Sequence, residues 1–379
     1  MRILFLHSSS DLYGASKILL AVTELCQKNL HKVTIVLSEN GELAHKLQQN
    51  GAEVVILDLG ILRRQYLSVQ GLLNRTITIY KAYKSLSKLC KERQIDLIYS
   101  NTTGVIVGIF VAAHQKIHHL WHVHEIIEKP YPLFRFLSYL LNKKQNQTIV
   151  VSEAVKTHWK KYVAPEKIKV LYNGVDYWLF DNKETNFRAE IGIDKEAIVV
   201  GMMGRVHFWK GQDYFLKIAS ILHKTFPKLI FVSVGDAFPG YEYLYDNLNT
   251  IIQEEQLQEV VKQVKYRSDI VNVYNAFDLF VLPSLLPDPA PAVVTEAMAC
   301  GIPVAITKQG GAVEMIEENV SGILLPLNNP NEAAAKITPL IQDAVVRKKM
   351  GTQARIRIEN HFSRTLFNQK IIELIEQKQ

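Results

Sequence analysis

The chain has 379 residues, of which 48% are hydrophobic and 21% are charged. This length and composition predict two or three globular domains with a large apolar core, and they exclude intrinsic disorder, collagen and disulfide-stabilised scaffolds. The net charge of +7 is uneven: residues 1–175 hold 23 Lys/Arg against 12 Asp/Glu, whereas residues 176–379 hold 21 against 25. A basic first half favours an anionic partner such as a phospholipid, a phosphorylated acceptor or a nucleic acid.

The cysteines and the apolar runs predict the cellular location. Cys26, Cys90 and Cys300 lie far apart and form no CxxC pair, which favours a reducing, cytosolic compartment. The first apolar stretch is too short for a secretion signal, and the longest run, residues 104–113, is about half of a membrane span. We therefore expect a cytoplasmic protein that crosses no membrane, although it could lie on one.

In chain order, the first half alternates β-rich runs with helical patterns. The predicted strands cover residues 2–7, 32–37, 53–57, 95–100, 119–123 and 148–151. Several are continuous apolar runs, which are typical of parallel strands covered on both faces. Between the first two strands, residues 14–29 carry an apolar stripe at helical spacing. This βαβ order predicts a doubly wound parallel sheet.

The second half repeats the scheme. Its predicted strands cover residues 198–203, 229–234, 260–264, 279–282 and 303–307. We therefore expect two Rossmann-like domains, residues 1–175 and 176–362, joined where an Asn-Gly pair at 173–174 favours a turn. A last helical segment, 363–379, begins at the good N-cap Ser363 and has an apolar stripe but no strand after it.

The sharpest motif covers residues 282–303, LPSLLPDPAPAVVTEAMACGIP. We expect a strand to end at Pro283, a proline-rich loop to follow, and a helix to begin near Pro291. Asp288 and Glu296 can then both face the crevice at the carboxyl ends of the strands. Loop amides at a helix N-terminus suit anions and sugar hydroxyls, and a carboxylate such as Glu296 can accept from both hydroxyls of a ribose.

This segment resembles the two-acid signature of retaining glycosyltransferase family 4, in which an acid and seven further residues precede Glu-Ala-Met-Ala-x-Gly-x-Pro. The resemblance implies the α/β GT-B fold, with two Rossmann-like domains facing across a cleft. It also implies transfer of a sugar from a nucleotide sugar with retention at the anomeric carbon. In that fold the first domain binds the acceptor, the second binds the nucleotide sugar, and the terminal helix 363–379 packs back on the first domain.

Further motifs follow in the family's order and imply site residues. Arg205 and Lys210, in Gly-Arg and Lys-Gly pairs, resemble the family's grip on the sugar donor's diphosphate. A forked guanidinium and a compact ammonium suit that anion. His124 matches a histidine beside the transferred sugar, where it orients the sugar or handles a proton. With Asp288, these three residues are the expected catalytic set.

The resemblance implies a wider set of contacts to the sugar donor. Gly14 stands in a glycine loop after the first strand, Gly235 precedes an aspartate after a later strand, and Tyr266-Arg267 resembles a segment beside the nucleobase. The loop that replaces the family's Glu and Gly-Phe-Gly with Asp288-Pro289-Ala290-Pro291 completes the set. The expected residues are Gly14, Arg205, Lys210, Gly235, Tyr266, Arg267, Asp288, Ala290, Ala292, Val293 and Glu296.

Two basic stretches have two interpretations. Residues 75–93 carry six Lys/Arg against one acid, and residues 131–144 combine aromatic residues with flanking lysines. The second pattern suits a helix lying in the interface of an anionic membrane. Alternatively, the apolar faces of both stretches pack on the sheet and the charges are solvated. No motif supports a nucleic-acid partner.

The resemblance therefore implies a retaining hexosyltransferase. We expect a nucleotide-sugar donor, UDP-hexose before GDP-mannose, and a glycan, glycolipid or lipid-linked acceptor of surface polysaccharide biosynthesis. No Asp-x-Asp spacing occurs, so we expect no metal and no cofactor beyond the nucleotide sugar. One alternative is a non-catalytic nucleotide-binding subunit of a membrane-associated glycan-synthesis complex. A sugar isomerase or phosphorylase is a rival enzyme, whereas the absence of GxGxxG after an early strand argues against a dehydrogenase.

Overall fold

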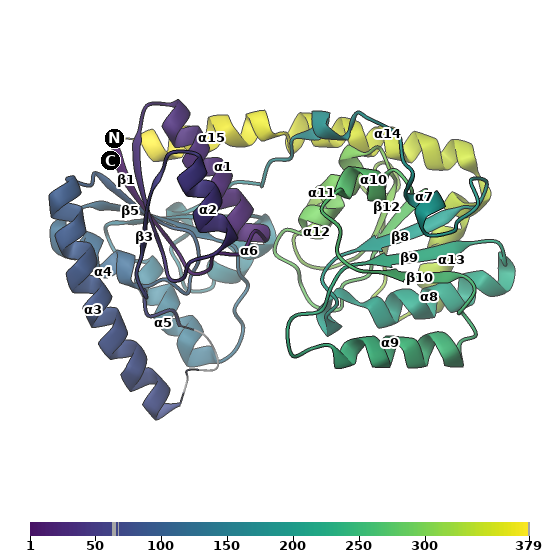
Figure 1. Cartoon of the computed structure of the whole chain (residues 1–379), viewed down its shortest axis with the longest axis horizontal. Coiled ribbons are helices and arrows are strands. Elements are labelled where there is room, and N and C mark those ends of the chain that lie inside the picture. The colour runs from purple at the N-terminus through teal and green to yellow at the C-terminus, as the bar shows by residue number, and fades with distance from the viewer. Residues whose placement is uncertain (63–65, 67, 378–379) are drawn as a thin grey trace. The chain divides into compact units, whose positions relative to one another are not determined.

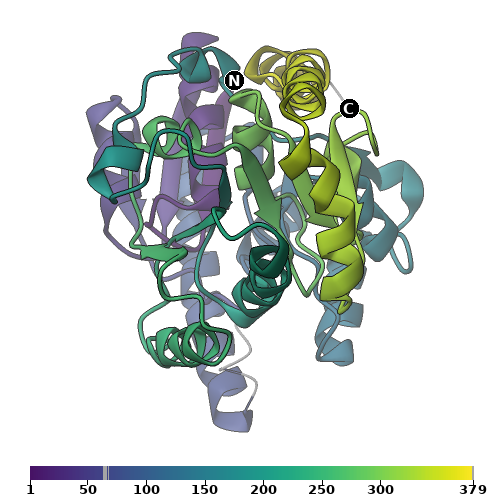
Figure 2. The ribbon, with the colours of Figure 1, turned by 90° about the vertical axis from the view of Figure 1, so that its right-hand side faces the viewer.

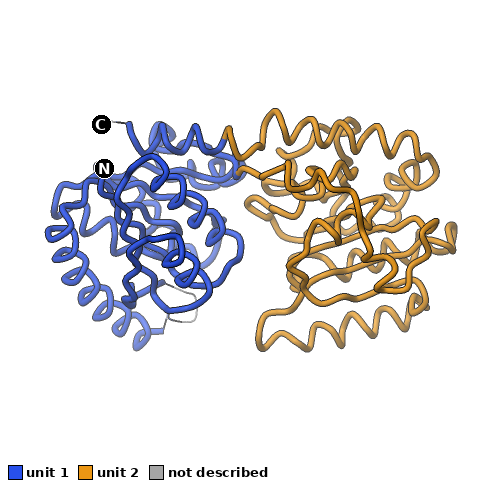
Figure 3. The backbone as a smooth tube through the Cα atoms, turned by 45° about the horizontal axis from the view of Figure 1, so that its top comes forward, with its two compact units in different colours: residues 1–173, 367–379 blue, residues 174–366 orange. Residues whose placement is uncertain are grey.

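The computed structural model describes residues 1–62, 66 and 68–377, and its chain divides into two compact units. The N-terminal unit comprises residues 1–173 and 367–379, and the C-terminal unit comprises residues 174–366 (Figure 3). Each unit is built on its own parallel β-sheet.

Strands and helices alternate through the N-terminal unit. Its elements are β1 (Arg2–His7), α1 (Gly14–Lys28), β2 (Lys32–Leu37), α2 (Glu42–Gln49), β3 (Glu53–Ile56), α3 (Val69–Arg93), β4 (Leu97–Ser100), α4 (Val107–Gln115), β5 (His118–Val123), α5 (Tyr131–Leu141), β6 (Asn146–Val150), α6 (Glu153–Trp159), the 3-10 helix η2 (Pro165–Lys167) and β7 (Ile168–Val170).

The seven strands form one sheet in the order β3-β2-β1-β4-β5-β6-β7. Strand β1 shows why the apolar runs are continuous. Ile3 and Phe5 pack in a core with α1 and α2 on one face, whereas Leu4 and Leu6 pack with α3 and α4 on the other (Figure 1). The chain order reverses between β1 and β4, so the loops after these two strands meet at a topological switch point.

The last helix, α15 (Arg364–Glu376), contributes to the core of the N-terminal unit. Phe367, Ile371 and Ile375 are buried there beside α1, which confirms the predicted apolar stripe. The helix begins after Ser363, whose Oγ accepts from Leu366 N at 3.4 Å. Residues 378–379 of the predicted segment lie outside the described residues.

The C-terminal unit continues the alternation. Its elements are the 3-10 helix η3 (Tyr177–Phe180), α7 (Phe187–Glu190), β8 (Val199–Met203), the 3-10 helix η4 (Phe208–Lys210), α8 (Gln212–Thr225), β9 (Ile230–Val234), α9 (Tyr243–Glu254), β10 (Val261–Val264), α10 (Ile270–Tyr274), β11 (Leu279–Leu282), α11 (Ala292–Ala299), β12 (Val304–Thr307), α12 (Ala312–Met315), β13 (Gly322–Leu325), α13 (Pro330–Gln342) and α14 (Ala344–His361).

Six parallel strands in the order β10-β9-β8-β11-β12-β13 form the second sheet. Its switch point lies between β8 and β11, which pair directly. Around the sheet, α13 packs on α8 and α14, and α8 packs on α9 (Figure 2). Two Rossmann-like sheets therefore confirm the predicted fold class. Within the described residues, every helix is either too short or too polar to span a bilayer.

Candidate functional site

The loops that follow β8 and β11 bring two predicted residues together. Lys210 ends η4 after β8, and Asp288 lies in the loop between β11 and α11. Lys210 Nζ forms an ion pair with Asp288 Oδ2, and both side chains are only 18% exposed. This pair of opposite charges lies at the carboxyl ends of the two strands that flank the switch point, where an ionic ligand can bind.

Two glycines in neighbouring loops allow a close approach to the loops after β8 and β11: Gly235 follows β9, and Gly310 follows β12. At Gly235, where φ is +150°, an added Cβ would lie 1.9 Å from the carbonyl oxygen of Gly204. At Gly310, where φ is +64°, it would lie 2.5 Å from the carbonyl oxygen of Asp288. The neighbouring Gly311 N donates to that oxygen at 2.7 Å. Gly235 therefore shapes the loop after β8, and Gly310 fixes the backbone of Asp288.

Arg205 lies at the start of the same β8 loop. Its guanidinium stacks on Phe238, with Cζ 3.6 Å from the ring centroid. Its carbonyl oxygen accepts from Gln212 Nε2 at 2.9 Å, which ties the loop to α8. The aromatic ring supports the guanidinium and orients it.

Glu296 lies on α11 and is held by a buried tyrosine from α10. Tyr274 is completely buried and donates its hydroxyl hydrogen to Glu296 Oε2 at 2.8 Å. Burial raises the pKa of Tyr274 well above its ordinary value, so the hydroxyl stays a hydrogen-bond donor. Pro291 caps α11, so Ala292 and Val293 lie in its first turn, where amides have no intrahelical acceptor. Ala290 is half-buried in the preceding loop.

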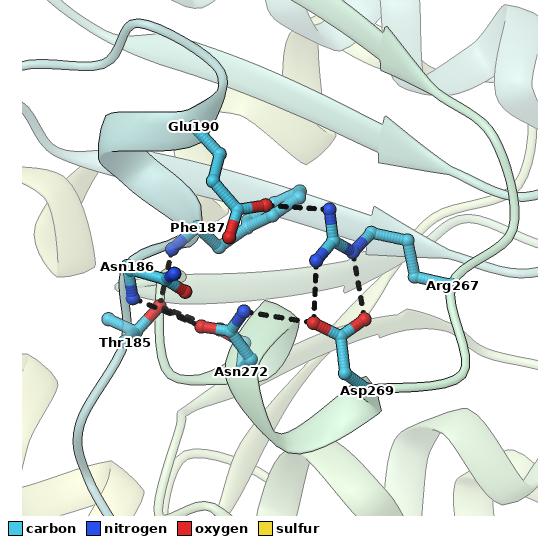
Figure 4. A network of polar contacts seen from close by, with 7 residues as sticks. All are labelled: Thr185, Asn186, Phe187, Glu190, Arg267, Asp269 and Asn272. Carbon is cyan, nitrogen blue, oxygen red and sulfur yellow. Dashed lines mark hydrogen bonds and ion pairs between the residues drawn. The ribbon is translucent and has the colours of Figure 1, made fainter.

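Arg267 belongs to a polar network at the end of β10, shown in Figure 4. Its guanidinium donates to Asp269 at 2.6 and 2.8 Å and to Glu190 Oε2, on α7, at 2.7 Å. The hydrogen bonds from Arg267 hold the pKa of the Asp269 carboxyl well below its usual range. Arg267 thus clamps its own loop to α7, and the neighbouring Tyr266 presents a 46% exposed side chain.

A hollow of about 630 Å³ borders this network. Among the described residues, no lysine or arginine lines this hollow, so it does not suit a diphosphate. The cations Arg205 and Lys210 instead lie in the loop after β8. The lining residues are Asn182, Glu184, Thr185, Asn186, Ser268, Asp269, Ile270, Val271 and Asn272.

The two remaining predicted residues belong to the N-terminal unit. Gly14 is the first residue of α1, and an added Cβ there would meet no described atom within 4 Å. His124 directly follows β5 and is half-buried, with Nε2 3.2 Å from Asn101 Oδ1. Burial lowers the pKa of His124 well below its ordinary value, and the neighbouring His122 ring adds to this effect. The histidine is therefore neutral near pH 7.

Glu125, the acid that follows His124, is held by hydrogen bonds within the N-terminal unit. Glu125 accepts from the hydroxyl of Thr102 and from the backbone N–H groups of Thr103 and His124, at 3.3 and 3.1 Å. It thereby joins the loops after β4 and β5. Burial raises the pKa of Glu125, whereas these hydrogen bonds act in the opposite direction.

Sequence reasoning missed three side chains that hold the predicted residues. Tyr274 orients Glu296, Glu190 holds Arg267, and Asn101 contacts His124. Asn101 carried a usable signal, because a polar residue directly after a buried strand lies at the ligand-binding edge of a parallel sheet. Tyr274 gave no such signal, since an aromatic residue in an apolar helix is ordinarily part of the core.

The two basic stretches form α3 and α5. Their inner faces pack on the sheet, with Leu86 of α3 and Leu140 of α5 buried. Their outer faces nevertheless expose large apolar residues, including Leu73 at 63% and Tyr139 at 59%. Packing of the inner faces on the sheet is therefore confirmed, and membrane binding by the outer faces stays a prediction. Across residues 1–62, 66 and 68–377, no three His, Cys, Asp or Glu side chains gather as metal ligands.

Two units with Rossmann-like sheets, and cations and acids at a switch point, are the features expected of a glycosyltransferase of GT-B fold. Family models agree: the one described as Glycosyltransferase Family 4 matches residues 13–178, and the one described as Glycosyl transferases group 1 matches residues 183–357. The chain therefore belongs to glycosyltransferase family 4.

Known proteins resemble this chain over most or all of its length. Anabaena HepE, solved in complex with UDP, is 26% identical over 99% of both chains, with a TM-score of 0.86. A UDP-glucose complex of HepE has a TM-score of 0.85. The Escherichia coli UDP-Gal:alpha-D-GlcNAc-diphosphoundecaprenol alpha-1,3-galactosyltransferase is 26% identical over 93% of this chain and 90% of its own. An uncharacterized glycosyltransferase of Methanocaldococcus jannaschii is 25% identical over 74% and 68%.

Proposed function

We propose that the protein is a metal-independent, retaining glycosyltransferase that moves a hexose from a UDP-sugar, with GDP-mannose as the second candidate. The observation that carries this proposal is the convergence of Arg205, Lys210, Asp288 and the tethered Glu296 on the β8 and β11 edge of one sheet. HepE binds UDP and UDP-glucose, which supports a uridine donor.

Each residue has a chemical role in this proposal. Glu296 accepts hydrogen bonds from the ribose hydroxyls, in the orientation that Tyr274 fixes. Arg205 and Lys210 neutralise the diphosphate, whose negative charge grows as the sugar leaves. Lys210 then exchanges its partner Asp288 for the phosphates, which releases the carboxylate to accept from sugar hydroxyls. The positive charges of Arg205 and Lys210 are in place before the reaction begins, so the site needs little reorganisation.

The remaining predicted residues complete the site in the proposal. Gly14, Gly235, Ala290, Ala292 and Val293 allow the backbone to approach the nucleotide sugar closely. Tyr266 and the loop clamped by Arg267 lie beside the nucleobase. His124 contacts the sugar.

The acceptor is proposed to be a glycan, a glycolipid or a lipid-linked sugar at the cytoplasmic face of the membrane, in surface polysaccharide synthesis. The galactosyltransferase relative is named for a diphosphoundecaprenol-linked acceptor. On α3, Leu73, Ile77 and Tyr80 are at least half exposed, and Lys81 and Lys84 lie on the same helix. Exposed apolar residues beside lysines suit the interface of an anionic bilayer.

The test is release of nucleotide from UDP-glucose, UDP-galactose, UDP-N-acetylglucosamine and GDP-mannose, in the presence of a chelator. Glu296→Ala and Lys210→Ala are compared with the wild type, and Lys217→Ala on α8 serves as a matched control because it removes a cation elsewhere in the same unit. We expect slow hydrolysis of one sugar donor, abolished in the two site variants and retained in the control. Hydrolysis that survives in both site variants would contradict the proposal that Glu296 and Lys210 bind the sugar donor.

The alternative function, a non-catalytic nucleotide-binding subunit, predicts a different result. Its basis is the loop 288–291, where two prolines remove backbone N–H groups. UDP would then bind, as measured by calorimetry, but no sugar donor would turn over even with membrane extract as a source of acceptor.

A further inference from the structure

Five polar side chains form a continuous hydrogen-bonded chain through the N-terminal unit. Asp11 lies in the loop after β1, Ser16 on α1, His7 at the end of β1, Asn101 after β4 and His124 after β5. Four of them carry no role in the function proposed above. Their positions coincide with the switch point of the sheet, between β1 and β4.

Asn101 determines the direction of the hydrogen bonds. Its Nδ2 donates to the carbonyl oxygen of Ala15 at 2.8 Å, which fixes the orientation of the amide, and lies 3.4 Å from His7 Nδ1. The amide oxygen therefore faces His124 Nε2, at 3.2 Å. An amide oxygen can only accept, so Nε2 of His124 carries the hydrogen.

The other half of the chain runs in the same direction. His7 Nδ1 accepts from Asn101, so its Nε2 carries the hydrogen and donates to Ser16 Oγ at 3.0 Å. Ser16 Oγ then donates to Asp11 Oδ1 at 3.0 Å. Every bond points toward a carboxylate, and hydrogen bonds aligned in this way polarise one another.

Burial keeps the chain in one protonation state. His7, Ser16 and Asn101 are each at most 2% exposed, whereas Asp11 is exposed. Burial lowers the pKa of His7 to about 4, so its imidazole is neutral near pH 7 and one of its nitrogens can accept. His124 is also neutral there.

We propose that Asp11, Ser16, His7 and Asn101 hold His124 as the Nε2–H tautomer, which leaves Nδ1 to accept a hydrogen bond from a hydroxyl of the sugar substrate. In the part of the chain that the structure describes, His124 Nδ1 has no hydrogen-bond partner and is not fully buried. The hydroxyl as ligand rests on the proposed function, whereas the tautomer does not. Asn101, His7 and Ser16 are then positioning residues.

The tautomer can be measured without activity. Nitrogen-15 NMR of the full chain, labelled at histidine, distinguishes protonated from unprotonated ring nitrogens, and His124→Gln identifies the signals of His124. We expect a protonated Nε2 and an unprotonated Nδ1 at pH 7. Asn101→Leu should produce a mixture of tautomers. The matched control is Asn146→Leu, because Asn146 is also buried and its Oδ1 lies 2.8 Å from Nδ1 of another histidine, His119.

Kinetics supply the second readout. Asn101→Leu should lower kcat about tenfold, the loss expected for one misdirected hydrogen bond, with the Kd for UDP unchanged. Asn146→Leu should leave kcat near the wild-type value. Ser16→Ala breaks the chain with a smaller change of volume, so it provides the test if Asn101→Leu does not fold.

Two results would overturn the inference. The first is a His124 that carries its hydrogen on Nδ1, or on both nitrogens, at pH 7. The second is an unchanged tautomer ratio in the folded variants of Asn101 and Ser16. A protein that turns over no sugar donor would refute the proposed function alone, since the NMR measurement still decides the tautomer.

Discussion

Tyr274→Phe removes one hydroxyl from a completely buried ring and tests whether Glu296 binds the nucleotide. In the wild type this hydroxyl donates to Glu296 Oε2 at 2.8 Å. Without it, Glu296 loses one contact that orders its side chain, and part of that ordering must occur when the ligand binds. Ordering one such side chain costs about 0.5–1.5 kcal/mol, which corresponds to a Kd for UDP roughly 2–12-fold higher.

The assay is isothermal titration of UDP into the wild type and the variant. Tyr214→Phe is the matched control, because Tyr214 is also buried in the C-terminal unit and its hydroxyl donates to the carbonyl oxygen of Pro326 at 2.8 Å. We expect the control to bind UDP like the wild type. Equal Kd values for Tyr274→Phe and Tyr214→Phe would refute the reasoning.

A double-mutant cycle sharpens the test. If Tyr274 acts through Glu296, then Tyr274→Phe should have no further effect on the Kd in a Glu296→Ala background. Additive effects of the two substitutions would instead mean that the tyrosine supports the site by another route.

Three further predictions concern stability and metal dependence. Burial lowers the pKa of His119 and of His122 to about 3, so below pH 6.5 the unfolded chain binds protons that the folded chain does not. The free energy of unfolding should therefore fall by up to about 1.4 kcal/mol for each histidine with each unit by which the pH is lowered. Urea unfolding at pH 7.5 and 5.5 checks this, and equal values would contradict it. Ile371→Ala should destabilise the N-terminal unit by about 2–5 kcal/mol in urea unfolding, whereas the exposed Lys370→Ala should change little; equal effects would place α15 outside that core. Chelator should leave the rate of nucleotide release unchanged, and a loss restored by Mg²⁺ would refute metal independence.

The fold was largely predictable because its strands are buried on both faces. Strands β1, β2 and β11 have the predicted bounds, because each contains a continuous apolar run. Strands β7 and β13 were not predicted. Residues Ile168–Val170 are only three and contain a lysine, and Gly322–Leu325 begin with a glycine, so neither shows a period.

The candidate site was predictable as a set of residues but not as a set of contacts. The motifs indicated Lys210 and Asp288, yet their ion pair joins positions 78 apart and depends on how the sheet brings two loops together. The same holds for Asn101 and His124, whose loops follow neighbouring strands. The hydroxyl of Tyr274 gave no signal, because it belongs to a side chain that is otherwise core.

The most direct test of the central claim is proton NMR of the turnover of the preferred nucleotide sugar, started with a known α-anomer. We predict that nucleotide is released and that the first sugar product is the α-anomer, formed by the wild type and not by Glu296→Ala. A β-anomer as first product would contradict retention. No turnover with any sugar donor, in the presence of membrane extract as a source of acceptor, would contradict glycosyl transfer itself.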